Sequence, residues 1–227
     1  MLGGQTVIER VYRQVEKVLD DVCVATDDQR ILDAVVGFGG QAVMTSPNHR
    51  SGTDRIRQAY DLLDADHDVV VNIQGDEPFI RPEQIRSLCT CFDEADTQIA
   101  TLVKPFTAAD GLEALDNPNS PKVVVDDRWH ALYFSRSVVP YLRGVERNEW
   151  LQHHTFLRHI GLYAYRADVL RRITELPPSP LEQAESLEQL RWLQAGYTIK
   201  VATTDTDTIG IDTPDDLRRA EAFLQHR

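Results

Sequence analysis

Two short acidic motifs contain the residue types that a site for Mg²⁺ and phosphate requires. Residues 74–78 (Gln-Gly-Asp-Glu-Pro) follow an apolar run, and residues 210–214 (Gly-Ile-Asp-Thr-Pro) precede a predicted helix. A glycine lets the backbone turn tightly beside a ligand, and Asp76 would project from a fixed strand end. Sites for nucleotidyl transfer usually hold Mg²⁺ with one or two carboxylates and the substrate phosphates. Asp76 and Asp212 are therefore candidate metal ligands.

Both motifs also have a purely structural interpretation. Residues 74–78 could form an ordinary strand-to-helix turn in which Asp76 or Glu77 only caps the next helix. Thr213 is a good N-cap, and acidic residues suit the first turn after it. Asp212 lies just outside that cap, which does not need it. The role of Asp212 as a second metal carboxylate thus stays open from the motif alone.

Two further polar clusters follow or precede predicted elements. Thr26 and Asp27 come directly after a short apolar strand, where open α/β sheets bind their ligands. Residues 51–55 (Ser-Gly-Thr-Asp-Arg) could begin a helix, with Ser51 or Thr53 as its cap. An arginine in the first turn opposes the helix dipole, so Arg55 invites a ligand explanation. Small polar residues and exposed amides here could read the edge of a nucleotide base.

Residues 156–163 alternate in the manner of a strand, with His159 and Tyr163 on one face. A lone histidine beside a tyrosine is more often a satisfied structural group than a catalytic one. Glu188 and Gln189 fall on a predicted helix, where a solvated helix face is the simpler interpretation. These four residues alone do not define a site.

The elements that must position these residues alternate between strand and helix. This alternation predicts right-handed βαβ units and an α/β sandwich. The predicted strands are residues 21–25, 41–44, 67–73, 98–103 and 198–201, and the predicted helices are residues 6–18, 29–36, 53–64, 82–95, 168–175, 181–195 and 214–225.

The alternation of strands and helices is interrupted between about residues 122 and 165. Residues 122–126 and 130–134 predict a hairpin, residues 142–155 are polar and irregular, and residues 160–165 are apolar again. We therefore predict a single domain, residues 1–227, with a mostly parallel sheet and an antiparallel excursion at about 122–165.

Composition limits the classes of partner. The chain has 227 residues, a net charge of −12 and 36 acidic against 24 basic residues. Polymeric nucleic acid and anionic membranes need a basic face, so neither is an expected partner. There is no apolar run of about 18 residues and no signal-peptide pattern. Three cysteines (Cys23, Cys89 and Cys91) without metal-ligand spacing indicate a reducing cytoplasm.

The ordered set of motifs resembles the 3-deoxy-manno-octulosonate (Kdo) cytidylyltransferases, a family of sugar nucleotidylyltransferases. The similarity covers nearly the whole chain, and each motif is modest while the ordered set is specific. The matching stretches are residues 24–27, 44–45, 49–55, 71–78, 117–119, 122–123, 131–136, 156–163, 178–182, 186–191 and 212–214.

The resemblance implies a Rossmann-like nucleotidyltransferase α/β/α sandwich and the reaction of CTP with Kdo to give CMP-Kdo and pyrophosphate, for lipopolysaccharide biosynthesis. The anomeric hydroxyl of Kdo would attack the α-phosphorus directly. The resemblance also implies a homodimer, with the excursion forming the sugar-binding and dimer region.

Site residues follow from the same resemblance. Asp76 and Asp212 would hold Mg²⁺, and Arg136 would pair with the sugar carboxylate. The nucleotide would be bound by Thr26, Asp27, Ser51, Gly52, Arg55, Gln74 and Asp76. The sugar would be surrounded by Arg136, His159, Tyr163, Glu188 and Gln189.

The sequence departs from the family at its start. Family members open with a strand and a phosphate-binding loop, approximately Ile-Pro-Ala-Arg-x-x-Ser-x-Arg-x-Pro-Gly-Lys-Pro-Leu, whereas this sequence begins with Met-Leu-Gly-Gly. We expect either that the coding sequence starts upstream of Met1 and the complete protein carries this loop, or that the shorter chain exists and is unstable and inactive, and we favour the first. The 227-residue chain itself is expected to have little synthetase activity. The alternatives are a cytidylyltransferase for another acidic sugar, such as a sialic-acid-like one, and a non-catalytic ligand-binding remnant.

Overall fold

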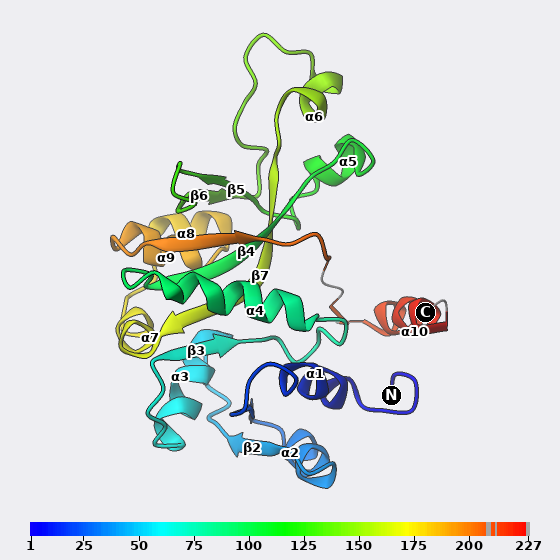
Figure 1. Ribbon diagram of the computed structural model, residues 1–227, viewed down its shortest axis with the longest axis vertical. Coiled ribbons are helices and arrows are strands. Elements are labelled where there is room, and N and C mark those ends of the chain that lie inside the picture. The colour runs from blue at the N-terminus through cyan, green and yellow to red at the C-terminus, as the bar shows by residue number, and fades with distance from the viewer. Residues whose placement is uncertain (208–209, 212, 226–227) are drawn as a thin grey trace. The chain divides into compact units, whose positions relative to one another are not determined.

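A computed structural model describes residues 1–207, 210–211 and 213–225, and Figure 1 shows its helices and strands. The chain has the predicted α/β composition and divides into two compact units. Unit 1 comprises Met1–Asp68, Asn72–Arg86 and Thr208–Arg227, and unit 2 comprises Val69–Val71 and Ser87–Asp207. The prediction of one domain over residues 1–227 stays a prediction.

Unit 1 contains a two-stranded parallel sheet of β1 (Cys23–Thr26) and β2 (Gln41–Met44). Helix α2 (Gln29–Gly37) connects these strands, and Asp28 caps it by accepting a hydrogen bond from the Arg30 N–H. The other helices of unit 1 are α1 (Val7–Val15), α3 (Gly52–Leu62) and α10 (Pro214–Gln225).

The larger sheet has six strands in the described part of the chain. Its order is β6-β5-β7-β4-β8, and β3 also pairs with β7. The strands are β3 (Val69–Asn72), β4 (Ile99–Pro105), β5 (Lys122–Val125), β6 (Ala131–Ser135), β7 (Leu157–Arg166) and β8 (Ile199–Thr203).

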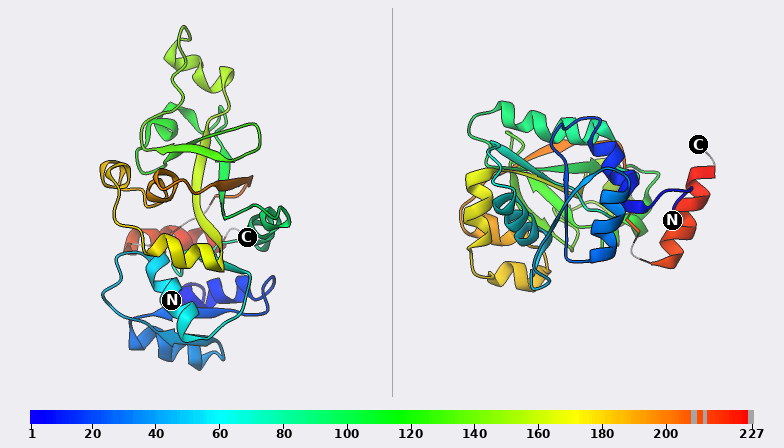
Figure 2. Two further views of the ribbon diagram at one scale, coloured as in Figure 1. Left: turned by 90° about the vertical axis from the view of Figure 1, so that its left-hand side faces the viewer. Right: turned by 90° about the horizontal axis from the view of Figure 1, so that it is seen from below.

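The α/β class is confirmed, and so is the antiparallel excursion within a mixed sheet. Among the described strands of the larger sheet, β4 and β8 pair in parallel, whereas β7 runs antiparallel to both β4 and β5, and β5 runs antiparallel to β6. The physical reason is that the excursion returns through β7, which enters the sheet between β4 and β5. Figure 2 shows this long strand in yellow-green, crossing its unit.

The remaining helices are short; one prediction about them is wrong, and one helix was missed. The helix predicted over residues 181–195 is two helices, α8 (Pro180–Glu185) and α9 (Gln189–Gln194), because Ser186 adopts a left-handed conformation (φ +51°) that ends the first. Helix α5 (Gly111–Asp116) was not predicted. The others are α4 (Pro82–Thr90), η1 (Cys91–Asp93), η2 (Arg147–Glu149), α6 (Trp150–His153) and α7 (Ala167–Thr174).

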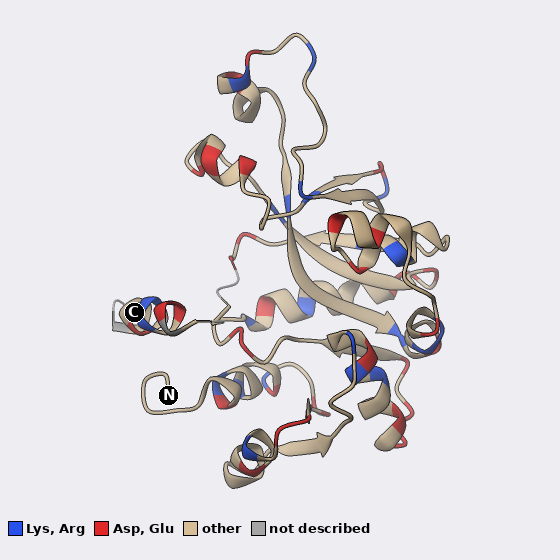
Figure 3. Cartoon of the chain, turned by 180° about the vertical axis from the view of Figure 1, so that it is seen from behind, with Lys and Arg blue, Asp and Glu red and all other residues tan. Residues whose placement is uncertain are grey.

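Each unit has its own buried apolar cluster. In unit 1, Leu2, Phe79 and Ala220 pack together with partly buried neighbours that include Ile211. In unit 2, Phe106, Leu115, Trp150 and Phe156 form a cluster at the excursion. No helix among the described residues is long and apolar enough to cross a membrane. Figure 3 shows acidic and basic residues interspersed on the helices of both units.

Candidate active site

Most of the predicted nucleotide-binding residues line a single cavity in unit 1. The cavity has a volume of about 820 Å³, and β1 with the segment 72–76 forms part of its wall. Much of the lining is apolar. Its polar residues are Thr6, Tyr12, Thr26, Asp28, Arg30, Arg55, Asn72, Gln74 and Asp76. The predicted residues that line it are Thr26, Gly52, Arg55, Gln74 and Asp76.

Arg55 has hydrogen-bond partners directly after each of the two strands, β1 and β2. Its Nη2 donates to Asp27 Oδ2 (2.9 Å), and its Nη1 donates to the buried Thr45 Oγ1 (2.7 Å). The ion pair with Asp27 explains how an arginine is tolerated in the first turn of α3, where the helix dipole disfavours a cation. The guanidinium is thereby held in a fixed orientation at the cavity.

Gly52 and Gln74 approach each other closely. A Cβ built on Gly52 would lie 3.6 Å from Gln74 Nε2, so the amide of Gln74 faces the first turn of α3. Ser51 is the N-cap of this helix, because its hydroxyl accepts a hydrogen bond from the Asp54 N–H (3.2 Å). Ser51 does not line the cavity, so the structure gives it a capping role beside the site.

Asp76 lies against the segment that carries the second acidic motif. The Ile211 N–H donates to the Asp76 carbonyl (2.9 Å), and a Cβ on Gly210 would be 4.0 Å from Asp76 Oδ2. Asp212 itself lies outside the described residues. The two acidic motifs are thus adjacent in unit 1, although 134 positions separate Asp76 from Gly210 in the sequence.

The expected cap of α10 is present. Thr213 Oγ1 accepts a hydrogen bond from the Asp216 N–H (3.2 Å), and Asp216 Oδ2 accepts from the Thr213 N–H (2.8 Å). The hydrogen bonds from Thr213 and Arg219 lower the pKa of Asp216 to about 2, with the Thr213 hydroxyl the largest cause. Asp216 therefore stabilises the start of the helix directly after the second motif.

The predicted sugar-binding residues all lie in unit 2, and two of them are neighbours on β7. The rings of His159 and Tyr163 have centroids 5.4 Å apart. A bulge in the β4–β7 pairing places Tyr163 opposite Thr101 and Ile160 opposite Leu102. The hydroxyl of Thr101 lies 3.1 Å from His159 Nε2 and also contacts backbone carbonyls within the bulge. Thr101, which sequence reasoning missed, therefore orients the imidazole.

Burial determines the protonation of both β7 side chains. It lowers the pKa of His159 to about 3 and raises the pKa of Tyr163 well above its usual value. His159 is consequently neutral at pH 7. A neutral imidazole can donate to or accept from a sugar hydroxyl, but it cannot form an ion pair with a carboxylate.

Glu188 and Gln189 lie at the start of helix α9. Glu188 is near Tyr163, because its negative charge contributes to the raised pKa of that tyrosine. The Arg191 guanidinium holds Glu188 Oε1 at 2.5 Å, so this carboxylate is not part of a merely solvated face. Gln189 is buried, and its Nε2 has no hydrogen-bond partner among the described residues. An unpaired buried donor is costly unless something else satisfies it.

Arg136 is held by main-chain carbonyls rather than by a carboxylate. Its Nε donates to the Glu185 carbonyl (2.6 Å), its Nη1 to the Pro118 carbonyl (2.9 Å) and its Nη2 to the Ser186 carbonyl (3.2 Å). The backbone N–H of Arg136 also donates to Glu185 Oε2 (2.9 Å). These bonds use three of the five guanidinium N–H groups, which leaves two for a ligand.

Lys122 supports this arrangement from within the protein. It is completely buried, and its ammonium donates to the carbonyls of Asn117 (3.1 Å), Ser120 (3.0 Å) and Arg136 (2.9 Å). Burial lowers its pKa. The only sequence signal for this role is a lysine at the start of an otherwise apolar strand.

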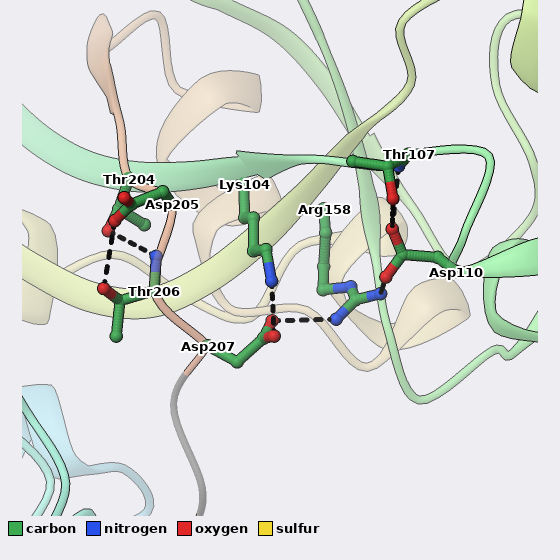
Figure 4. A network of polar contacts seen from close by, with 8 residues as sticks. All are labelled: Lys104, Thr107, Asp110, Arg158, Thr204, Asp205, Thr206 and Asp207. Carbon is green, nitrogen blue, oxygen red and sulfur yellow. Dashed lines mark hydrogen bonds and ion pairs between the residues drawn. The ribbon is translucent and has the colours of Figure 1, made fainter.

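A polar network lies at the ends of β4, β7 and β8 in unit 2 (Figure 4). Asp207 forms ion pairs with Lys104 and with Arg158 (Nη1–Oδ1 3.0 Å), and Arg158 also contacts Asp110. The hydroxyl of Thr107 donates to Asp110 and is the largest cause of its lowered pKa. The network fixes Arg158, which directly precedes His159 on β7.

Three cysteines, Cys23, Cys89 and Cys91, are free thiols, and burial raises the pKa of each. Raised pKa values disfavour the thiolate, which is the form that attacks electrophiles or binds metal. Among the described residues, no group of three or more His, Cys, Asp or Glu side chains could hold a metal ion.

Comparison with known proteins places this arrangement in a family. The family model described as cytidylyltransferase matches residues 1–200. A 3-deoxy-manno-octulosonate cytidylyltransferase from Phocaeicola vulgatus is 63% identical over 227 residues, which cover 100% of this chain and 90% of the relative. The protein of the same name from Bacteroides thetaiotaomicron is 60% identical, with 100% and 91% covered.

A solved structure agrees with these relatives. It is a CMP:2-keto-3-deoxy-manno-octonic acid synthetase complexed with CTP, 40% identical to this chain, with a TM-score of 0.90 and coverage of 100% of this chain and 90% of the other. Sequence identity, coverage and fold therefore lead to the same conclusion. The chain belongs to the 3-deoxy-manno-octulosonate cytidylyltransferases, within the cytidylyltransferase family.

Proposed function

We propose that the chain transfers CMP from CTP to Kdo, giving CMP-Kdo and pyrophosphate. The observation that carries this proposal is the placement of Thr26, Gly52, Arg55, Gln74 and Asp76 around one cavity, in a chain 63% identical to a relative named for this activity. The names of these relatives do not favour the alternatives of a sialic-acid-like substrate or a non-catalytic remnant.

The nucleotide binds in unit 1. Arg55, oriented by Asp27 and Thr45, supplies a fixed cationic donor, and the Gln74 amide beside Gly52 supplies a neutral one. A small residue at position 52 leaves room for a ligand close to the helix amides of α3. Ser51 keeps this end of α3 in place as its cap.

The residues in unit 1 fit a divalent cation. Mg²⁺ prefers oxygen ligands and is usually bound by one or two carboxylates plus substrate phosphates rather than by a complete protein cage. Asp76 has the required carboxylate, and the hydrogen bond from Ile211 to its carbonyl fixes the backbone directly before Asp212. We assign Asp76 and Asp212 as the ligands of Mg²⁺, which when bound neutralises phosphate charge.

The acidic sugar binds in unit 2. The two remaining N–H donors of Arg136 suit its carboxylate, because a guanidinium forms charge-assisted hydrogen bonds with carboxylates. The amide nitrogen of Gln189, which has no partner within the described ranges, suits a hydroxyl, as does the neutral imidazole of His159. Tyr163 and Glu188 complete the set, and Arg191 keeps Glu188 in place.

In the reaction, the anomeric oxygen forms a bond to the α-phosphorus and loses its proton to water, while the bond from the α-phosphorus to the bridging oxygen breaks and pyrophosphate leaves. The side chains contribute by positioning both substrates and by neutralising charge, the two effects that dominate phosphoryl and nucleotidyl transfer. Neither step needs a covalent intermediate with the protein.

The proposed homodimer would use the excursion. Tyr141 is 77% exposed there, and Leu132 is 61% exposed on β6. Exposed apolar side chains of this size are the usual anchors of an interface. Sedimentation velocity with the wild type and with Tyr141→Glu tests the assignment, since the variant should be monomeric at concentrations at which the wild type is a dimer.

Product analysis tests the function. The chain is incubated with CTP, Mg²⁺ and either Kdo or N-acetylneuraminic acid, and the products are identified by mass spectrometry. We expect CMP-Kdo and pyrophosphate in equal amounts, no product with the second sugar, and a rate at least about 100-fold lower for Asp76→Asn, because a ligand of the metal is lost. Asp33→Asn, at an exposed position of α2, is the matched control. Formation of CMP-neuraminate but not CMP-Kdo would overturn the proposal.

A further inference from the structure

Glu185 is the last residue of α8, and its carboxylate accepts hydrogen bonds from the end of strand β6 and the residue after it. Oε1 accepts from the hydroxyl of Ser135 (2.7 Å), and Oε2 accepts from the backbone N–H of Arg136 (2.9 Å). Tyr133 also forms a side-chain hydrogen bond with this carboxylate, since residues two positions apart on a strand point to the same face. Ser135 is buried, so water does not readily replace Glu185 as its partner. The carboxylate therefore joins the end of α8 to the end of β6.

Glu185 also contacts the side chain of Arg136, through its backbone carbonyl. This carbonyl accepts from Arg136 Nε (2.6 Å), and the neighbouring carbonyl of Ser186 accepts from Nη2 (3.2 Å). Glu185 thus binds Arg136 at both its main chain and its guanidinium. A long side chain loses rotamer entropy when it is ordered. Because these bonds order Arg136 in the free protein, that entropy is not lost when a ligand binds.

These bonds orient the guanidinium without neutralising it. Among the described residues, Arg136 forms no ion pair with a carboxylate, and its side chain donates to neutral backbone carbonyls. The negative charge of Glu185 is instead directed at neutral donors, the Ser135 hydroxyl and the Arg136 backbone N–H. The remaining N–H groups of the guanidinium therefore keep the positive charge that makes hydrogen bonds to a carboxylate strong.

We infer that Glu185 is a positioning residue for sugar binding, which holds Arg136 in the orientation that receives the carboxylate of the acidic sugar. This inference rests on the proposed function, because it takes that carboxylate as the ligand of Arg136. Glu185 belongs to none of the sets of site residues predicted from the sequence, and it acts through Arg136 without contacting the sugar. Loss of its side chain should free the end of α8 from β6 and thereby displace the two carbonyls that orient the guanidinium.

Isothermal titration calorimetry with Kdo tests the inference. Glu185→Ala should raise the Kd for Kdo at least about tenfold, because a charge-assisted contact is lost, and should leave the Kd for CTP unchanged. Gln183→Ala, at an exposed position of the same helix, is the matched control and should change neither Kd. Ser135→Ala removes one donor to the carboxylate and should raise the Kd for Kdo about threefold, which keeps the test decisive if Glu185→Ala does not fold. An unchanged Kd for Kdo in Glu185→Ala and Ser135→Ala would overturn the inference.

A double-mutant cycle shows whether Glu185 acts through Arg136. Once Arg136 is replaced by alanine, Glu185 has no guanidinium to position. In the Arg136→Ala background, Glu185→Ala should therefore change the Kd for Kdo less than about twofold. Glu185→Gln keeps the length of the side chain and an acceptor for the Arg136 backbone N–H, so its Kd should stay within about threefold of the wild-type value. Equal weakening by Glu185→Ala in both backgrounds would show an effect that does not pass through Arg136, and the inference would fail.

The NMR signal of the Arg136 Nε–H group reports on the orientation without any substrate. Its hydrogen bond to the Glu185 carbonyl should slow its exchange with water at neutral pH in the wild type and in Glu185→Gln. In Glu185→Ala this exchange should be at least about tenfold faster, and an equally slow exchange would contradict the positioning role. Neither readout depends on catalysis. A wild type that binds Kdo but forms no CMP-Kdo would refute the proposed function alone, whereas a wild type that does not bind Kdo would refute both.

Discussion

Replacement of Lys122 by methionine should destabilise unit 2 and weaken sugar binding. Methionine keeps an apolar chain of similar length, but it removes the ammonium that donates to three carbonyls. Those carbonyls belong to Asn117, Ser120 and Arg136. Because Lys122 is completely buried, water cannot readily replace the lost donor.

Two opposing effects set the magnitude. Hydrogen bonds to a charged group contribute roughly 1.5–3 kcal/mol each, and burial of an ammonium costs several kcal/mol. The lowered pKa of Lys122 reflects that cost. Removal of the ammonium also removes its desolvation cost but leaves the acceptors unsatisfied, so we expect a net loss of about 3 kcal/mol. For a chain of this size that corresponds to a decrease in Tm of roughly 6–12 °C.

The assay measures both thermal unfolding and the steady-state KM for each substrate. Because Lys122 holds the carbonyl of Arg136, Lys122→Met should raise the KM for Kdo more than the KM for CTP. Lys17→Met, at an exposed position of unit 1, is the control and should change neither quantity. A variant Lys122→Met with a Tm within about 2 °C of wild type would refute this reasoning.

Three further changes test other parts of the structure. Burial lowers the pKa of His159 to about 3, below the unfolded value of about 6.5, so the unfolded state binds more protons between these two pH values. Stability should therefore fall as the pH decreases through this window. The free energy of urea unfolding should differ less between pH 7 and pH 4.5 for His159→Gln than for wild type, and an equal difference would contradict the assignment. Arg55→Ala should raise the KM for CTP at least about tenfold through loss of a charge-assisted donor, whereas Arg57→Ala, which breaks an ion pair further along α3, should leave it unchanged in the same kinetic assay. Trp192 is buried against the ring of Tyr163, and its indole N–H has no hydrogen-bond partner in the described part of the chain. Trp192→Phe should therefore cost less than about 1.5 kcal/mol in chemical unfolding and Trp192→Ala about 3–5 kcal/mol. Equal losses would show that the indole nitrogen matters more than the ring volume.

Local patterns in the sequence predicted local structure well. The bounds of β2 and α10 agree with the prediction, because turn residues flank β2 and a capping threonine marks the start of α10. Of the two predicted caps of α3, Ser51 and Thr53, the structure shows Ser51. Such a cap is predictable because its hydrogen bond joins residues three positions apart.

Long-range pairings could not be predicted from local patterns. Neither periodicity nor propensity encodes that β7 lies between β4 and β5, because strand order depends on contacts among distant segments. The same limit applies to single side chains. The partner of Arg55 is 28 positions away at Asp27, and Thr101 contacts His159 across 58 positions.

The candidate site, too, could be predicted only in part. Resemblance to a family supplied the residue positions, and the structure supplied their surroundings. It places five of the seven nucleotide residues around one cavity, and it shows Arg136 bound to carbonyls that no sequence motif indicates. Asp212 lies outside the described residues, so its metal role stays a prediction.

The left-handed conformation of Ser186 ends a helix and thereby determines which hydrogen bonds Arg136 can form. In an unbroken helix over residues 181–195, the carbonyls of Glu185 and Ser186 would accept hydrogen bonds from amides four positions later. The break withholds both carbonyls from that ladder, and the Arg136 guanidinium binds them instead. Helix propagation and guanidinium binding thus compete for the same two acceptors. A left-handed non-glycine residue costs of order 1–3 kcal/mol, so the strain at position 186 opposes the Arg136 contacts, and Ser186→Gly should tighten them without adding a single new contact.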